Sequence, residues 1–404
     1  MNSTVSITYE DAKNWNWQIV GGTGTGKGLL LQLIASQFIM NKSSCVFFDP
    51  KFDDFLPKIL SQECERHDVP FLLIDLEFDK AHITLFKNDR FEIIEQCLSA
   101  GFMLDFQGNA QDFYKSAEQE VIEELSVFIK ENSSLTLPEA IDLFLRRDIC
   151  NDKNVKKLAI ELKRLSQVKS INTLCGVDIH EAIESHALIY IKCSTDSSRI
   201  LLLQRILLAS ILQYCKYRER DYSRHVAIVL DEFKYLQSNI AVKALATIRS
   251  MNANIIVAHQ SIDDLKDCPA NMNSQSVVSA MTENCNIKIT YKVKAPETAK
   301  YFAEMSGEVL VEEPQYTYET TNSLTQQKKL SKTTREVASY YMEPNVFKAL
   351  RKGEAVIFFD GLPQKFYTSP IKLKSTTVDP CVDEKYCFEV KIDKFGSKGL
   401  IDVD

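Results

Sequence analysis

The chain has 404 residues, of which 45% are hydrophobic and 25% are charged, and its net charge is −7. This composition is typical of soluble globular proteins, and the 13 Gly and 11 Pro argue against long disordered tracts. The length predicts more than one domain. The acidic balance disfavours a protein coated all over in nucleic acid, but it is compatible with a basic channel inside an acidic shell.

Targeting and metal signals are weak in this sequence. The first ten residues lack a basic start followed by an apolar run, and the apolar stretch Leu29–Met40 is too short to cross a bilayer. The 11 cysteines are scattered singly, without a CxxC pair or a histidine at zinc-finger spacing. We therefore expect a cytoplasmic protein with reduced thiols, no membrane span and no structural zinc.

The first 90 residues alternate between strand and helix patterns. Apolar runs predict strands at 15–20, 44–48 and 71–76, and apolar periodicity predicts helices at 27–40 and 55–64. Strands that alternate with helices are typical of a parallel, doubly wound sheet. We therefore predict an α/β fold with a phosphate loop between the first strand and the first helix.

Helical periodicity dominates from about residue 91 to residue 186. Thr136-Leu137-Pro138-Glu139 fits a capping box at the start of a helix that runs through Arg146. A second predicted helix, at 153–169, carries Lys156, Lys157, Lys163 and Arg164. These cations are suited to phosphate contacts, although a solvated face is the more common outcome. We predict an inserted all-α subdomain.

Sheet signals resume at residue 187. Strands are predicted at 187–193, 225–230, 254–258, 287–291 and 355–359, with helices at 198–218, 241–249 and 296–305 between them. The segment 309–337 is polar and rich in Thr, Gln and Lys, which predicts a loop or mobile arm. The expected domains are 1–90 and 187–371 for the two parts of the nucleotide-binding domain, 91–186 for the insertion and 372–404 for a tail.

The segment GGTGTGKG, at residues 21–28, is the strongest motif. Its glycines let backbone N–H groups surround phosphates, and Lys27 would hold the β- and γ-phosphates. Gly28 stands where a Ser or Thr usually binds Mg²⁺. The alternative is a glycine-rich turn without a ligand. We assign phosphate contacts to Gly21, Gly22, Thr23, Gly24, Thr25, Gly26, Lys27, Gly28 and Leu29, with ATP and Mg²⁺ as cofactors.

A second motif, IVLDEF at residues 228–233, delivers two acids at the end of an apolar strand. Parallel sheets place their ligand crevice at this end of the strands. Asp231 would hold Mg²⁺ through its water shell, and Glu232 would polarise the attacking water. Because two independent motifs coincide, the ligand-free alternative becomes much weaker.

Four further residues are candidates on weaker grounds. Asp49 is a candidate for contact with the metal through water, or a simple turn acid beside a proline. Gln260 follows a strand and would sense the γ-phosphate, and Arg249 would reach a neighbouring subunit's nucleotide as a finger. The alternative for Arg249 is a surface salt bridge. We interpret His259 as a packing or substrate-contact residue.

These motifs together resemble the TraG/TraD-like coupling ATPases of conjugation and type IV secretion, relatives of the FtsK and HerA translocases. The resemblance covers roughly residues 15–371 and includes a loop ending in GKG, FFDPKFDDF, LDEF, IIVAHQS and LRKGEAVIFFDGLPQKFY, in this order. It implies a RecA-like P-loop NTPase with a mostly parallel twisted sheet. It also implies the sensor role for Gln260 and the finger role for Arg249.

The resemblance implies a motor that hydrolyses ATP to recruit and pump DNA, or a relaxase–DNA complex, into a secretion channel. Its expected partners are DNA, relaxosome proteins and the type IV secretion apparatus. The family usually carries N-terminal transmembrane helices, whereas here the first strand begins about fifteen residues after Met1. Either this chain simply lacks that anchor or a separate membrane protein recruits it, and we expect a cytoplasmic protein that is recruited to the inner face of the cell membrane. A homo-hexamer is expected when active, with a monomer in isolation as the alternative.

Two other functions stay open at this stage. One is an FtsK- or HerA-like DNA translocase outside secretion, which would share the core but differ in partners. The other is a nucleotide-gated docking platform that receives secreted substrates and hydrolyses little ATP. Gly28 and the missing anchor favour the platform.

Overall fold

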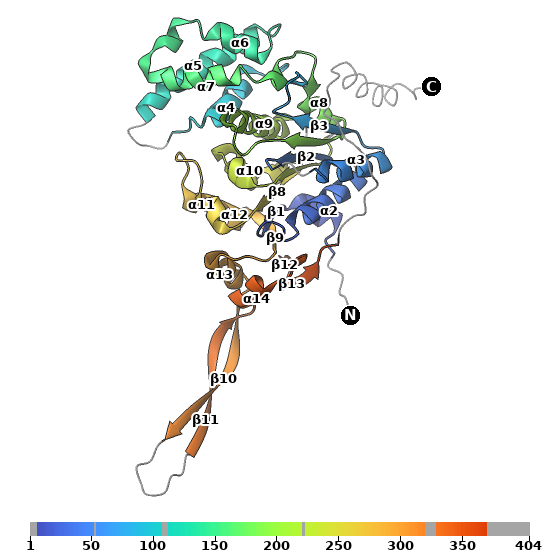
Figure 1. Ribbon diagram of the computed structural model, residues 1–404, viewed down its shortest axis with the longest axis vertical. Helices are drawn as coiled ribbons and strands as arrows, with labels where there is room; N and C mark the ends of the chain where they lie inside the picture. Colours follow the sequence, from blue (N-terminus) through green and yellow to red (C-terminus); the bar gives the residue numbers. More distant parts are fainter. Residues whose placement is uncertain (1–5, 52–53, 107–111, 220–222, 320–328, 370–404) are drawn as a thin grey trace.

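A nine-stranded sheet forms the centre of the protein (Figure 1). The computed structural model describes residues 6–51, 54–106, 112–219, 223–319 and 329–369, so the predicted tail lies outside the described residues. The strand order is β13-β12-β9-β1-β8-β7-β2-β6-β3. Its strands are β1 (Asn16–Val20), β2 (Ser44–Asp49), β3 (Phe71–Asp75), β6 (Leu188–Lys192), β7 (Val226–Leu230), β8 (Ala253–His259), β9 (Cys285–Thr290), β12 (Glu354–Phe358) and β13 (Gln364–Tyr367).

The sheet is mostly parallel, as predicted. Seven strands from β9 to β3 pair in parallel, and β12 pairs antiparallel with both β9 and β13. Every residue of β1, β2, β7 and β8 is buried. Strands covered on both faces read as continuous apolar runs, which is why the sequence patterns located them well.

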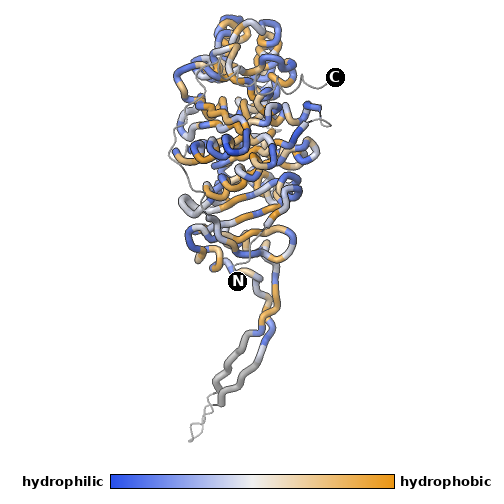
Figure 2. The backbone as a smooth tube through the Cα atoms, turned by 90° about the vertical axis from the view of Figure 1, so that its right-hand side faces the viewer, coloured by the Kyte–Doolittle hydropathy of each residue, from blue (hydrophilic) through white to orange (hydrophobic). Residues whose placement is uncertain are grey.

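Helices cover both faces of the sheet. On one face, Cys45 and Phe47 of β2 pack with α2 (Lys27–Met40) and α3 (Leu56–Arg66). On the other, Val46 and Phe48 pack with α9 (Ser198–Tyr217), α10 (Asn239–Thr247) and α12 (Ser274–Asn284). This alternation along β2 follows from the two-residue period of a strand. Figure 2 shows the hydrophobic stretches concentrated in the body formed by these layers.

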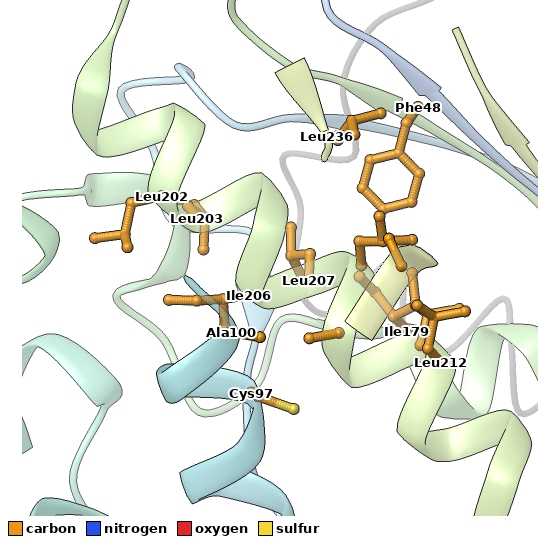
Figure 3. Close-up of a cluster of buried hydrophobic side chains, with 14 of the residues drawn as sticks. Phe48, Cys97, Ala100, Ile179, Leu202, Leu203, Ile206, Leu207, Leu212 and Leu236 are labelled. Atoms are coloured by element: carbon orange, nitrogen blue, oxygen red, sulfur yellow. The ribbon is translucent and has the colours of Figure 1, made fainter. Parts of the chain in front are cut away.

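Helix α9 lies between the sheet and α4 (Phe91–Phe102). Figure 3 shows Leu203, Ile206 and Leu207 of α9 among side chains of α4 and the sheet residue Phe48. By length and composition α9 is apolar enough to cross a membrane, but 72% of its apolar window is buried inside the protein. Its apolar surface is therefore used for packing within the fold.

The segment between β3 and β6 is largely helical and lies at one end of the molecule (Figure 1). The predicted capping box is present, because Thr136 and Glu139 exchange side-chain and backbone hydrogen bonds at the start of α6. The all-α prediction for 91–186 was not fully correct, since β5 (Val177–Asp178) pairs in parallel with β4 (Ile83–Thr84). Two residues are too short to produce a strand pattern. The helices are α4, α5 (Asp112–Glu131), α6 (Leu137–Phe144), α7 (Lys156–Leu165) and α8 (Ile179–Glu184), with 3-10 turns at Asp148–Asn151, Lys153–Val155 and Lys169–Ile171.

The segment 309–337, predicted to be a loop or mobile arm, is not a loop where the structure describes it. β10 (Glu308–Glu319) and β11 (Lys329–Tyr340) form an antiparallel hairpin that pairs only with itself among the described residues. It projects from the end of the body opposite the helical insertion (Figure 1). The remaining elements are α1 (Tyr9–Asn14), α11 (Ile262–Lys266), α13 (Pro296–Met305) and α14 (Pro344–Ala349), with 3-10 turns at Phe233–Tyr235 and Ile248–Met251.

Candidate functional site

The two strongest motifs of the sequence meet at one edge of the sheet. β1 leads into the glycine loop and β7 leads into Asp231, with β8 between them, so all three strands end at the same edge. A pocket of about 670 Å³ lies at this edge. Its lining includes Gly22, Thr23, Gly24, Gly26, Lys27, Gly28, Leu29, Gln32, Asp49, Lys51, Asp231, Glu232 and Lys352.

The glycine loop is held against β9 and the turn before β12. The Gly22 N–H donates to Lys292 O at 3.3 Å, and the Gly353 N–H donates to Thr25 O at 2.8 Å. Gly26 has φ 127°, a conformation that residues with a side chain rarely adopt, and an added Cβ would lie 2.8 Å from the Tyr291 ring. The glycine is therefore required here by both backbone and space. The loop ends where α2 begins, at Lys27.

Lys27 is buried and points back over the loop. Only 7% of its surface is exposed, and its ammonium donates to Gly21 O. Burial lowers its pKa, although the charges of Glu232 and Asp231 oppose this shift. A buried cation beside backbone N–H groups at the start of a helix suits a phosphate chain.

Asp231 and Glu232 have environments that drive their pKa values apart. Burial, followed by the charges of Glu232 and Asp49, raises the pKa of Asp231 to about 7. Burial also disfavours the Glu232 carboxylate, but the hydrogen bond from Lys51, the charge of Lys27 and the hydrogen bond from Gln260 outweigh it and lower its pKa. Such divergence is typical of acid pairs with separate roles.

Glu232 is held in place from two sides. Lys51 Nζ lies 2.6 Å from one carboxylate oxygen, and Gln260 Nε2 donates to the other at 3.0 Å. The Glu232 backbone is left-handed, with φ 47°, which is uncommon for a non-glycine residue and typical of functional positions. The structure thus brings Gln260 to Glu232, at the end of the strand between the two motifs.

Asp49 lies beside Asp231, because β2 and β7 are neighbours and the Asp231 N–H donates to Phe48 O at 3.1 Å. Only 2% of Asp49 is exposed, and it accepts hydrogen bonds from the Tyr190 hydroxyl and the Lys51 N–H. Asp49 therefore stabilises the turn after β2, as one of the two interpretations predicted, and it also lines the pocket.

Arg249 is not part of this pocket. It lies in the 3-10 turn before β8, at the opposite edge of the sheet, and its guanidinium carbon is 4.0 Å from the centre of the Trp15 ring. The side chain is exposed. Among the described residues its partner is an aromatic ring and not the acid of a surface salt bridge, and it lies at the other end of β8 from the pocket.

His259 is a packing residue. It is fully buried, and its ring nitrogens contact Gln18 at 3.1 Å and Ser261 O at 2.8 Å. Burial lowers its pKa to about 4, so the ring is neutral at physiological pH. A neutral, enclosed imidazole with two local partners satisfies its polar atoms inside the fold.

Sequence reasoning missed several residues of the pocket region, among them the apolar lining residues Phe55, Leu56 and Ile59. Lys51 and Lys352 line the pocket, and Tyr291 packs beneath the loop. Gln32, one turn after the loop, lines it too, and its buried Nε2 has no hydrogen-bond partner among the described residues. Lys51 belongs to the FFDPKFDDF segment of the family resemblance, and that segment is the signal that could have identified it. Tyr291 carries no sequence signal of its own.

Comparisons with known proteins show which proteins this chain resembles. Residues 225–352 match the family described as the TraM recognition site of TraD and TraG. The chain is 25% identical, over 312 residues, to Mobilization protein A of Escherichia coli, which covers 76% of this chain and 57% of that protein. Over residues 225–352 the chain is therefore similar to TraD and TraG.

Solved structures show the same fold. The unbound conjugative coupling protein TrwB matches with a TM-score of 0.65 and 15% identity, over 90% of this chain and 86% of that one. TrwB in complex with ADP and Mg²⁺ matches with the same score and identity, over 91% and 88%. VirB4 of Thermoanaerobacter pseudethanolicus matches with a TM-score of 0.54 and 16% identity, over 93% and 91%. The chain therefore has the RecA-like P-loop NTPase fold.

Proposed function

We propose that this TraG/TraD-like protein hydrolyses ATP to move DNA, or a relaxase–DNA complex, toward a type IV secretion channel. The observation that carries the proposal is the arrangement around Glu232, which Lys51 and Gln260 hold at the edge of the pocket that also contains Lys27. The likeness to TrwB, whose structures include complexes with nucleotides, supports the same conclusion.

The pocket has the chemistry for a Mg²⁺–nucleotide. Backbone N–H groups of the loop would bind the phosphates, and Lys27 would offset the charge that develops on the leaving group. Asp231 would hold Mg²⁺, which when bound neutralises phosphate charge. Glu232, kept ionised by Lys51, would accept a proton from the attacking water, and Gln260 would fix the orientation of Glu232.

The partners and the location are part of the proposal. Mobilization protein A is a relative of which this chain spans about 57%, and the matched family is described as a TraM recognition site. These support partners among relaxosome and conjugation proteins. We further propose a cytoplasmic hexamer, recruited by a separate membrane protein to the inner face of the membrane, in which Arg249 reaches a neighbour's nucleotide.

The test is ATP turnover with and without single-stranded DNA. Lys27→Ala and Glu232→Gln should each abolish DNA-stimulated hydrolysis. Lys300→Ala and Glu304→Gln are matched controls, since these exposed side chains pair with each other on α13 and line no part of the pocket. Full turnover by both pocket variants would refute the site, and equal losses in the controls would show that the assay reports general damage.

A docking platform with little hydrolysis is the second candidate, and Gly28 favours it. The position offers no hydroxyl for Mg²⁺. If DNA gives no stimulation while a relaxosome protein binds only when ATP is present, the platform is the correct function. If DNA stimulates ATP turnover, the motor is the correct function.

A further inference from the structure

A second pocket, of about 340 Å³, lies between the helical insertion and α9. It is away from the nucleotide pocket, with which it shares no residue. Its charged lining is one-sided, with a single acid, Glu161, against five basic residues. These are Lys115, Lys157, Arg164, Arg199 and Arg205.

Helical periodicity explains why these cations face one another. Lys157, Glu161 and Arg164 are spaced by four and three residues, so they share one face of α7. Ser198, Leu202 and Arg205 have a similar spacing on α9, which contacts α7. Gly101 forms part of the wall, where an added Cβ would lie 2.3 Å from Ile206 Cγ1. The missing side chain thus lets α4 pack close to α9 at this point.

The cations outnumber the local counter-charges. Glu118 is close enough to Lys157 and Lys115 to feel their charges, and with Glu161 it gives two acids against five bases. Among the described residues, no ion pair includes Lys157, Arg164 or Arg199. Even with Lys115 left out of the sum, four bases face two acids among the described residues, an excess of about two positive charges.

Arg205 is a partly buried member of this set. Its Nε is buried and has no hydrogen-bond partner among the described residues. Burial lowers its pKa to about 10, although the charge of Glu161 opposes the shift. A buried polar atom without a partner is costly and indicates a group that completes the site.

The first turn of α9 adds to the positive potential. The pocket is lined by Ser198 and Arg199, the first two residues of this 20-residue helix. N–H groups of a first turn have no partner within the helix, and the helix dipole makes this end partly positive. Like charges that face each other are unfavourable without an anion between them.

We propose that this pocket binds phosphate groups, with α7 supplying Lys157 and Arg164 and α9 supplying Arg199, Arg205 and its first turn. The phosphates come either from a nucleic-acid backbone or from a free polyphosphate. The site stands apart from ATP hydrolysis, because none of its residues lines the nucleotide pocket.

The test compares two double variants of equal charge change. Lys157→Gln with Arg164→Gln removes two pocket cations, whereas Lys153→Gln with Lys156→Gln removes two exposed cations of the same region that do not line the pocket. The full chain is titrated with a fluorescent single-stranded oligonucleotide at several salt concentrations, and with inorganic pyrophosphate by calorimetry. Hydrolysis without DNA is measured in parallel.

The pocket variant should bind the oligonucleotide on the order of tenfold more weakly at 0.1 M salt, and its log–log salt slope should flatten by about 1.4, or ~0.7 for each lost phosphate contact. The control should match the wild type. If only pyrophosphate binding is lost, the source is a free polyphosphate. Equal binding of both ligands by the wild type, the pocket variant and the control overturns the proposal. Unchanged hydrolysis without DNA separates this outcome from failure of the nucleotide site.

Discussion

Lys51 and Glu232 form an ion pair across the ends of β2 and β7, with 2.6 Å between Nζ and Oε1. Lys51 is partly exposed, whereas the Glu232 side chain is 7% exposed. The carboxylate is therefore kept ionised by a cation that remains in contact with solvent. Gln260 binds its other oxygen, so both the charge and the orientation of Glu232 depend on neighbours.

Replacement of Lys51 by Gln should shift the acid limb of the ATP turnover profile to higher pH. The hydrogen bond and charge of Lys51 lower the pKa of Glu232, so their loss raises that pKa and protonates the base in a range where the wild type is active. Turnover measured from pH 5 to 9 checks this. Lys51→Arg keeps the charge and should retain the wild-type profile; an unshifted limb in Lys51→Gln would contradict the role of the pair.

Asp231→Asn should stabilise the protein at pH 8 and have little effect at pH 4. Because the pKa of Asp231 is raised from 3.8 to about 7, the folded protein keeps a proton that the unfolded chain releases, and stability falls as pH rises through this window. The difference between the pKa values of Asp231 in the unfolded and folded states corresponds to at most roughly 4 kcal/mol of stability. Urea unfolding at both pH values measures it, with the exposed Asp196→Asn as control. Equal stability at pH 8 would show that the folded-state pKa is not raised.

Gly28→Ser should lower the Mg²⁺ concentration needed for half-maximal turnover severalfold. An added Cβ at Gly28 meets no atom within 4 Å, so a side chain fits, and serine restores the hydroxyl that usually binds this ion. Gly28→Ala is the matched control, because it should gain ~0.5–1 kcal/mol of helix stability without changing the Mg²⁺ requirement. Identical Mg²⁺ titrations for the two variants would contradict a metal beside this residue.

Arg249→Ala should leave nucleotide binding by the isolated chain unchanged but reduce DNA-stimulated turnover by ~10³-fold or more, the usual contribution of an arginine finger. Arg249 lies over Trp15 at the edge of the sheet opposite the pocket, so it would act on the nucleotide of a neighbouring subunit and not on that of its own chain. Trp15→Ala separates this role from simple packing. If Trp15→Ala and Arg249→Ala lower stability and turnover alike, Arg249 acts within its own chain.

The sheet and its helices were predictable because buried strands are long, apolar and bounded by clear turns. The hairpin of β10 and β11 was not predictable in this way. β10 and β11 are rich in polar residues and neither strand packs into the central sheet, so they lack the long apolar runs by which the buried strands were found. The two-residue strands β4 and β5 were missed for a related reason, because only their mutual contact defines them.

The site was predictable where backbone chemistry demands particular residues, as in the glycine loop and the LDEF strand end. Side chains that act through long-range contacts were not. Lys51 becomes meaningful only because β2 lies beside β7, and Tyr291 only because β9 lies beside β1. The five basic residues of the second pocket come from three helices, so the sequence showed the α7 cations and hid their convergence.

The base of the hairpin has a practical consequence. The Tyr341 N–H donates to Gly307 O at 2.8 Å, so the chain leaves the body and returns to it at nearly the same point. Twelve paired positions at ~3.4 Å each give a ribbon of about 40 Å, and its strands contribute nothing to the central sheet. A short turn is enough to join the two ends of the base. Removal of the ribbon should therefore leave the layers of the body intact.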